Sequence, residues 1–233
     1  MKLLRSVIEL TNRIMVQINK NKQIEVPAEF NSVRLNLGSG LAVTKGWINI
    51  DGSLNSLVAS LPNMLHILMY RLTGARAYYS EVEYCRLLRE HVFVHHDLAA
   101  GIPLKDSVAD YIFSSHFFEH LYQKDAAYLL RDCYRVLKEG ALLRISIPDL
   151  EYAIGLYVAG NKEKMLKNYF FVEHGDSVYS RHKYMYDFEM ISGLLRQIGF
   201  HEITRCKFQE GNLPDISVLD NRPEDSLFVE ARK

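Results

Sequence analysis

The sequence is poor in cysteine and carries no excess of either charge. Its 233 residues include three cysteines, Cys85, Cys133 and Cys206, which are far apart and form no C-x-x-C pair. Scattered cysteines in odd number predict neither a disulfide framework nor a thiolate zinc site, and they fit a cytoplasmic location. Lys plus Arg and Asp plus Glu each number 28, so the net charge is zero and no basic patch would attract phosphates. Nucleic acid is therefore not the expected partner.

The sequence also lacks long apolar runs and linkers. The longest stretch without Asp, Glu, Lys or Arg, residues 52–70, is broken by Pro62 and several polar residues. A spanning helix needs about 20 predominantly apolar residues, so we expect no integral membrane segment. The apolar stripe within 54–72 leaves peripheral membrane contact open. No repeat or Pro/Gly/Ser linker divides the chain, so we expect one domain over 1–233, of unknown oligomeric state.

Short strands alternate with helices along the chain. The clearest helices are expected at 123–139, stopped by Gly140, and at 188–198, between a capping Asp187 and Gly199. An N-terminal helical extension (1–30) and a helical insertion (54–90), broken near Pro62, are expected as well. This alternation is typical of an α/β fold with a mostly parallel sheet. The expected strands are rich in β-branched and aromatic residues and cover 33–37, 47–50, 92–94, 111–113, 142–147, 201–208 and 227–229.

Polar residues follow these strands one after another. In open parallel sheets ligands bind outside the carboxyl ends of the strands, so these positions are the ones to inspect. Glycines after the first strand would let a ligand approach the backbone, and acidic residues after the next two could bind ribose hydroxyls and an exocyclic amine. That order predicts an adenosine site. The residues after successive strands are Gly38-Ser39-Gly40, Asp51, His95-His96-Asp97, Ser114-Ser115-His116 and Pro148-Asp149.

Four sequence blocks carry a family resemblance. They are LNLGSG (35–40), GWINIDGS (46–53), HHDLAAGIPLKDSVADYIFSSHFFEHL (95–121) and CYRVLKEGALLRISIPDLE (133–151). In their order and spacing they resemble the motifs of class I S-adenosylmethionine-dependent methyltransferases of type 11, and HKYMYDFEMISGLLRQIGF (182–200) is similar to the tail of that family. The resemblance implies a Rossmann-like, seven-stranded, mostly parallel sheet with a reversed last strand and helices on both faces. It also implies S-adenosylmethionine as the cofactor.

The resemblance assigns cofactor contacts position by position. Gly38, Ser39 and Gly40 would lie against the methionine part, and Asp51, followed by Gly52, would bind the ribose. Asp97 would face the adenine amine and Leu98 the ring, while Ser115 and His116 would line the floor near the sulfonium. One feature departs from the family. Only residues 41–45 separate the glycine loop from Gly46-Trp47, too few for a crossover helix.

The expected reaction is methyl transfer to a hydroxyl of a small-molecule or glycan acceptor. His116 is the first candidate for a general base, because an imidazole titrates near neutral pH and this one follows the strand toward which the methyl should point. Asp149 and His182 are the second choices. Residues 151–187 are expected to form an acceptor-side lid, because aromatics are concentrated there among basic residues such as His174, Arg181 and Lys183.

Alternatives remain open. His116-Phe117-Phe118-Glu119-His120 matches H-x-x-E-H, which on a helix would hold zinc and make the chain a hydrolase. We expect no metal, because the segment follows a strand directly and no further acidic ligand is evident from the spacing. Asp51 and Asp97 could be turn and capping residues only. A non-catalytic S-adenosylmethionine-binding module is the third possibility.

Overall fold

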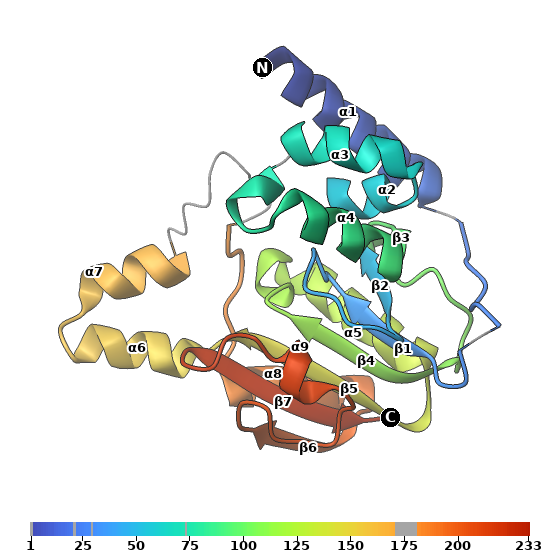
Figure 1. The fold of residues 1–233 in the computed structure, drawn as a ribbon. Helices are drawn as coiled ribbons and strands as arrows, with labels where there is room; N and C mark the ends of the chain where they lie inside the picture. Colours follow the sequence, from blue (N-terminus) through green and yellow to red (C-terminus); the bar gives the residue numbers. More distant parts are fainter. Residues whose placement is uncertain (1, 21, 29, 73, 171–180) are drawn as a thin grey trace.

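A seven-stranded sheet forms the centre of the molecule. The computed structural model describes residues 2–20, 22–28, 30–72, 74–170 and 181–233. The strand order is β3-β2-β1-β4-β5-β7-β6 (Figure 1). All neighbours pair in parallel except β7, which runs antiparallel to both β5 and β6. The expected sheet with a reversed last strand is confirmed. The strands are β1 (Arg34–Leu37), β2 (Ile48–Asp51), β3 (Val92–His95), β4 (Ala109–Ser115), β5 (Leu137–Pro148), β6 (His201–Cys206) and β7 (Ser226–Arg232).

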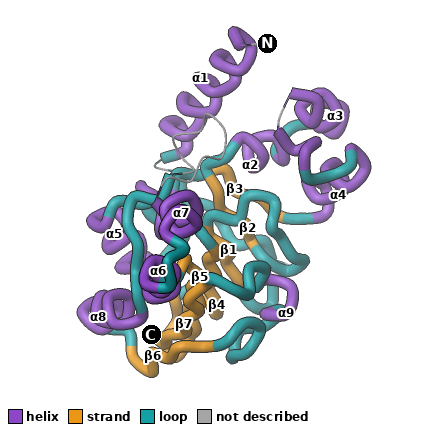
Figure 2. The backbone as a smooth tube through the Cα atoms, turned by 90° about the vertical axis from the view of Figure 1, so that its left-hand side faces the viewer, coloured by secondary structure: helices purple, strands orange, loops and turns teal. Residues whose placement is uncertain are grey.

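Helices cover both faces of the sheet. Figure 2 shows α5 and α8 on one side and α9 on the other, with α3 and α4 beyond the β3 edge. Short turns η1 (Gly74–Ala77), η2 (Leu98–Ala100), η3 (Phe118–His120) and η4 (Leu166–Phe170) connect the main elements. The helices are α1 (Lys2–Asn19), α2 (Leu54–Ala59), α3 (Asn63–Leu72), α4 (Glu81–Glu90), α5 (Gln123–Val136), α6 (Leu150–Val158), α7 (Lys162–Met165), α8 (Phe188–Ile198) and α9 (Ile216–Leu219).

The main core lies between the sheet and helices α5 and α8. Leu129 and Leu130 of α5 and Ile191 and Leu195 of α8 are fully buried there against the apolar side chains of the parallel strands. Their periodic spacing is what predicts both helices from the sequence. The other face carries a smaller core around Trp47, with Phe113, Leu142, Leu213 and Leu219. Burial on both faces fixes the central strands, whose carboxyl ends form one continuous edge.

The expected helix over 123–139 is too long at its end. α5 stops at Val136, and β5 begins at once with Leu137, which pairs with Ala109 of β4. Leu137 continues the apolar helical spacing but is buried as a strand residue. Gly140 lies inside β5 at φ +74 instead of ending the helix. Pairing with the neighbouring strand therefore overrides the helical pattern over the last residues.

The connection from β1 to β2 contains no helix. Residues 38–47 join two adjacent parallel strands through turns alone, as the short spacing in the sequence predicts. The amide N–H groups of a helix start are thus missing beneath the glycine loop. The loop is held by Asp51 instead, whose Oδ2 accepts a hydrogen bond from Gly40 N at 2.9 Å.

Helix α1 packs against the carboxyl ends of β2 and β3. Asn12 Nδ2 donates to Gly52 O at 3.0 Å, and Asn12 Oδ1 lies 3.0 Å from His95 Nε2. Asn19 Nδ2 donates to His95 O at 3.3 Å. The N-terminal helix therefore borders the edge at which the sequence predicts the cofactor.

The apolar stripe of residues 54–72 is split between two helices on either side of Pro62. Val58 of α2 is buried against α4, whereas Met64, Ile67 and Leu68 of α3 are exposed. None of the helices in the described part of the chain is long and apolar enough to cross a membrane. Contact of the exposed face of α3 with a membrane surface stays a prediction.

Candidate functional site

The site lies where the strand order reverses, between β1 and β4. Ligands of open α/β sheets bind at such a switch point, outside the carboxyl ends of the strands. Gly38 follows β1 with φ +67, and a Cβ placed on it would overlap the ring of Phe117, which follows β4. Only glycine lets the two loops meet this closely. The backbone at Gly38 and the segment containing His116 are thereby brought together.

Asp51 holds the end of β2 to the glycine loop. Besides the bond from Gly40 N, its Oδ1 accepts from Ser53 N at 2.6 Å. Both contacts are typical of a turn residue, which is the alternative role that the sequence leaves open for Asp51. Each carboxylate oxygen has two lone pairs, which leaves acceptor capacity on both for a hydroxyl group.

The third strand end contributes Asp97 and Leu98. Asp97 Oδ1 accepts from Ala99 N at 3.0 Å and caps η2, the role expected if Asp97 were a turn residue only. Leu98 is only 3% exposed and belongs to the main core, so little of its side chain faces the edge of the sheet. Ser39 is buried in the glycine loop, and Ser115 ends β4 opposite Ser146.

His116 has a strained backbone at the end of β4. Its φ of +49 lies in the left-handed region, which costs energy for a residue with a Cβ and often marks a functional site. Its Nε2 lies 2.9 Å from Ser226 Oγ, and its Nδ1 lies 3.4 Å from Glu119 Oε1. Among the described residues, Nδ1 is buried without a hydrogen-bond partner. One nitrogen of the imidazole therefore faces Ser226, and the other faces the buried carboxylate of Glu119.

Glu119 is surrounded by imidazoles. It is 1% exposed, and neither carboxylate oxygen has a hydrogen-bond partner in the described part of the chain. His120 Nε2 lies 3.8 Å from Glu119 Oε1, and the rings of His120 and His182 are 5.2 Å apart. One ligand atom each of Glu119, His120 and His182 lie within 4.8 Å of one another.

Burial and charge act in opposite directions on these groups. Burial raises the pKa of Glu119, but the facing imidazoles of His116 and His120 outweigh it and hold that pKa below its usual range. Burial lowers the pKa of His182, and the carboxylate of Glu119 only partly opposes this. The carboxylate is therefore ionised at neutral pH while His182 stays neutral.

Asp149 is engaged in structural contacts. It caps α6 by accepting from Glu151 N at 2.9 Å, and its Oδ2 forms an ion pair with Arg205 of β6 at 2.6 Å. Arg205 belongs to no motif, so this pairing could not be expected from the sequence. Both carboxylate oxygens of Asp149 are thus occupied by contacts within the chain, which fits a structural role.

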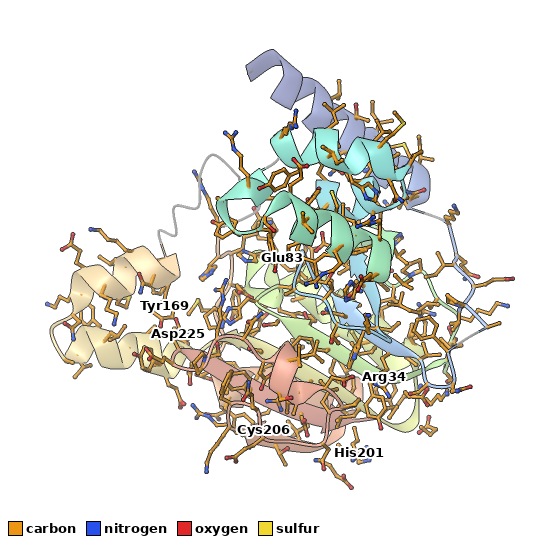
Figure 3. The ribbon with its side chains drawn as sticks, viewed as in Figure 1. Arg34, Glu83, Tyr169, His201, Cys206 and Asp225 are labelled. Carbon is orange, nitrogen blue, oxygen red and sulfur yellow. The ribbon has the colours of Figure 1, made fainter. Side chains whose placement is uncertain are left out.

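The expected lid forms an arm of three short elements, α6, α7 and η4, which projects from the body in Figure 1. Tyr169 and Asp225 lie side by side where the arm meets the start of β7 (Figure 3), and Tyr169 Oη donates to Asp225 Oδ2 at 3.2 Å. Tyr152, Tyr157 and Phe170 are exposed along the arm. Phe171, His174 and Tyr179 belong to the expected lid over 151–187 but lie outside the described residues.

Two surface cavities lie elsewhere. One is lined by residues of α3 and α4, including His66 and Cys85, and the other lies near Asp110 and Lys138 at the opposite end of the strands. Neither includes a cofactor residue expected from the sequence. The candidate site is thus defined by strand ends and loop contacts.

A family model matches part of the chain. Residues 58–145 match the family model described as "Methyltransferase domain". The match begins after Asp51 and covers less than half of the chain, including β3, β4 and α5. It confirms the methyltransferase recognition drawn from the motifs and, with it, S-adenosylmethionine as the cofactor. No curated protein sequence matches the chain.

Solved structures show a more distant likeness. One is a SAM-dependent methyltransferase from Archaeoglobus fulgidus, 17% identical over 97% of this chain and 94% of that chain, with a TM-score of 0.47. Another is a SAM-dependent methyltransferase from Thermotoga maritima, described as a possible histamine N-methyltransferase. It is 18% identical over 97% of this chain and 91% of that chain, with a TM-score of 0.47. At these identities and TM-scores the likeness does not indicate which acceptor this chain methylates.

Proposed function

We propose that this chain, a class I S-adenosylmethionine-dependent methyltransferase, transfers the methyl group to a hydroxyl of a small-molecule or glycan-like acceptor. The observation that carries the proposal is the contact between the glycine loop and the His116 segment at the switch point of the sheet. It places the backbone that would receive the cofactor next to the imidazole of His116, which lies between Ser226 and the Glu119 carboxylate.

The cofactor would extend along the carboxyl edge from β1 to β3. Gly38, Ser39 and Gly40 would receive the methionine part, because glycines let a ligand approach the backbone. Asp51 would use its remaining lone pairs to accept hydrogen bonds from the ribose hydroxyls, with Gly52 alongside. The other contacts would be made by Asp97 with the adenine amine and by Ser115 and His116 on the floor, whereas Leu98 is too deeply buried to cover the ring as expected.

Methyl transfer needs placement and the removal of one proton. The acceptor oxygen attacks the methyl carbon, the carbon–sulfur bond breaks with its electron pair going to sulfur, and S-adenosylhomocysteine leaves. The hydroxyl proton would pass to the imidazole of His116, whose Nε2 faces Ser226 and whose Nδ1 faces the Glu119 carboxylate at 3.4 Å. Ser226 at Nε2 would hold the ring in place. His182, whose Nδ1 lies 2.8 Å from Tyr169 O, is the next candidate base, followed by Asp149.

The acceptor would lie against the arm. Exposed tyrosines at 152 and 157 offer apolar surface with polar tips, which suits a sugar or a polar ring. Lys183, at the junction of the arm and the sheet edge, would meet anionic groups of the acceptor, and the neutral His182 would accept a hydrogen bond from it at Nε2. Substitutions in the arm should therefore impair acceptor binding while leaving the affinity for S-adenosylmethionine nearly unchanged.

The test begins with a screen of hydroxylated small molecules and sugar nucleotides, using labelled methyl donor. With an acceptor in hand, His116→Ala should lower the rate of the methyl step by about 10² to 10⁴. His201→Ala is the matched control, because His201 is exposed on β6 at the far edge of the sheet (Figure 3). Transfer only to nitrogen or carbon acceptors would contradict the proposal, and wild-type turnover of His116→Ala across pH 6 to 9 would exclude His116 as the base.

A further inference from the structure

We propose that Glu119, His120 and His182 bind one divalent transition-metal ion. The three side chains come from η3 and from the segment leading into α8, and one ligand atom of each lies within 4.8 Å of the other two. Glu119 is buried, while His120 and His182 are half-buried, so the group is reachable from solvent on the histidine side. No step of the methyl transfer described above requires Glu119 or His120.

Both histidines are oriented as metal ligands usually are. His120 Nδ1 lies 3.2 Å from Arg181 O, and His182 Nδ1 lies 2.8 Å from Tyr169 O. A carbonyl oxygen can only accept, so in each ring Nδ1 carries the proton and Nε2 carries the lone pair. Ligating histidines typically donate their other N–H to a backbone carbonyl or carboxylate in this way. Two rings are thus held with a free nitrogen for a common centre.

Glu119 provides an independent observation. Both of its oxygens are buried and lack a hydrogen-bond partner in the described part of the chain. The contacts that Oε1 makes are with imidazoles, that of His116 at 3.4 Å and that of His120 at 3.8 Å. A buried carboxylate paired this weakly is costly, and native proteins pair such groups fully or use them to coordinate metals. Backbone contacts hold its position, since Glu119 O accepts from Lys183 N at 2.7 Å and from Tyr184 N at 3.3 Å. The same contacts bring His182 back to the side of Glu119.

The ligand chemistry selects the metal class. Two imidazoles and one carboxylate suit zinc and its neighbours in the first transition row, whereas magnesium and calcium prefer oxygen ligands. Bonds of about 2.0 to 2.2 Å to a shared ion would require the three ligand atoms to draw together slightly from their present spacing. Three protein ligands leave one or more positions open. His116 Nδ1, 3.4 Å from Glu119 Oε1, lies nearby.

The arrangement differs from the one that the H-x-x-E-H pattern implies. That pattern pairs the two histidines of one helix and keeps the glutamate as a base. Here His116 belongs to the strained end of β4 and His120 to a single turn, so His120 is joined by His182 instead and Glu119 becomes a ligand. The ligand missing from the local pattern lies 62 positions further along the chain.

An open position on the ion could bind the acceptor. An oxygen bound to a divalent cation loses its proton more readily, which would assist transfer to a hydroxyl. This role rests on the proposed function, whereas the binding site itself does not. Metal binding is therefore tested without acceptor or methyl donor, so that failure of one proposal leaves the other standing.

The experiment uses the full chain, stripped with chelator and then titrated with Zn²⁺ and Co²⁺. We expect one ion per chain by elemental analysis after dialysis, and a visible absorption band for the Co²⁺ form. His182→Gln and Glu119→Gln should weaken binding by more than the roughly 10- to 100-fold that loss of a supporting hydrogen bond costs a metal site. His201→Gln, at an exposed histidine remote from the group, is the control and should bind as the wild type does.

The proposal would be overturned by the absence of stoichiometric Zn²⁺ or Co²⁺, by His182→Gln binding the ion as tightly as the wild type, or by binding of Mg²⁺ in preference to Zn²⁺. The change in melting temperature on adding Zn²⁺ distinguishes a metal site from a buried Glu119 carboxylate whose charge is balanced only by protonated histidines. Zn²⁺ should raise the melting temperature of the wild type and of His201→Gln but not that of Glu119→Gln, because an ion that binds only the folded state stabilises it. A shift of equal size in folded Glu119→Gln would contradict the site.

Discussion

Replacement of Gly38 tests the contact on which the site is built. Gly38→Ala has two costs, because the residue has φ +67 and its new Cβ would overlap the Phe117 ring. A left-handed backbone costs a residue with a Cβ about 1 to 2 kcal/mol. Displacement of a packed ring adds about 1 to 3 kcal/mol. The free energy of unfolding, measured with urea, should therefore fall by about 2 to 5 kcal/mol.

Gly40 provides the matched control. It has φ +52, but a Cβ there meets nothing within 4 Å, so Gly40→Ala should show only the backbone cost. In a Phe117→Ala background the effect of Gly38→Ala should fall toward that of Gly40→Ala without reaching it, because the ring is gone but the Cβ of residue 117 still lies 2.6 Å from the new Cβ. Equal destabilisation by Gly38→Ala and Gly40→Ala in the wild-type background would refute the close approach of the two loops.

Two further predictions concern stability. Arg144 is fully buried between Asp220, at 2.6 Å, and Glu230, at 3.0 Å, so Arg144→Met leaves two buried carboxylates unpaired and should cost about 3 to 5 kcal/mol in urea unfolding. A loss below 1 kcal/mol would contradict that pairing. Burial lowers the pKa of His95 and His96 in the folded state. As the pH falls through about 6.5 the unfolded chain takes up protons before the folded one does, so the free energy of unfolding should fall with falling pH. The loss for each residue is about 1.4 kcal/mol for every unit by which its folded pKa lies below its unfolded pKa. His96→Gln should reduce this slope between pH 7 and 5.5, and an unchanged slope would contradict the assignment.

The sequence predicts the fold well because its signals are local. Every expected strand is present, and α8 coincides with the expected helix over 188–198, with Asp187 Oδ1 accepting from Met190 N at 2.8 Å as the cap. The absence of a helix after the glycine loop also follows from spacing alone. The error at Leu137 has a different origin, because a residue that continues a helical stripe can equally well be buried by a strand partner.

Site contacts between distant segments escape local reasoning. The pairing of Arg205 with Asp149 and the approach of His182 to Glu119 each join segments more than 50 residues apart, and nothing in the spacing indicates them. No sequence motif indicates that Asn12 contacts the ends of β2 and β3 either. The residues that follow the strands could be named in advance, because parallel strands bring their carboxyl ends to one edge.

The measurement that tests the central claim most directly is a crystal structure of the chain with S-adenosylhomocysteine. We predict that the homocysteine part lies on Gly38 to Gly40, that the Asp51 carboxylate accepts hydrogen bonds from the ribose hydroxyls, and that the sulfur faces His116. A ligand bound away from the ends of β1 and β4, or an Asp51 whose only partners are still Gly40 N and Ser53 N, would contradict the site described here.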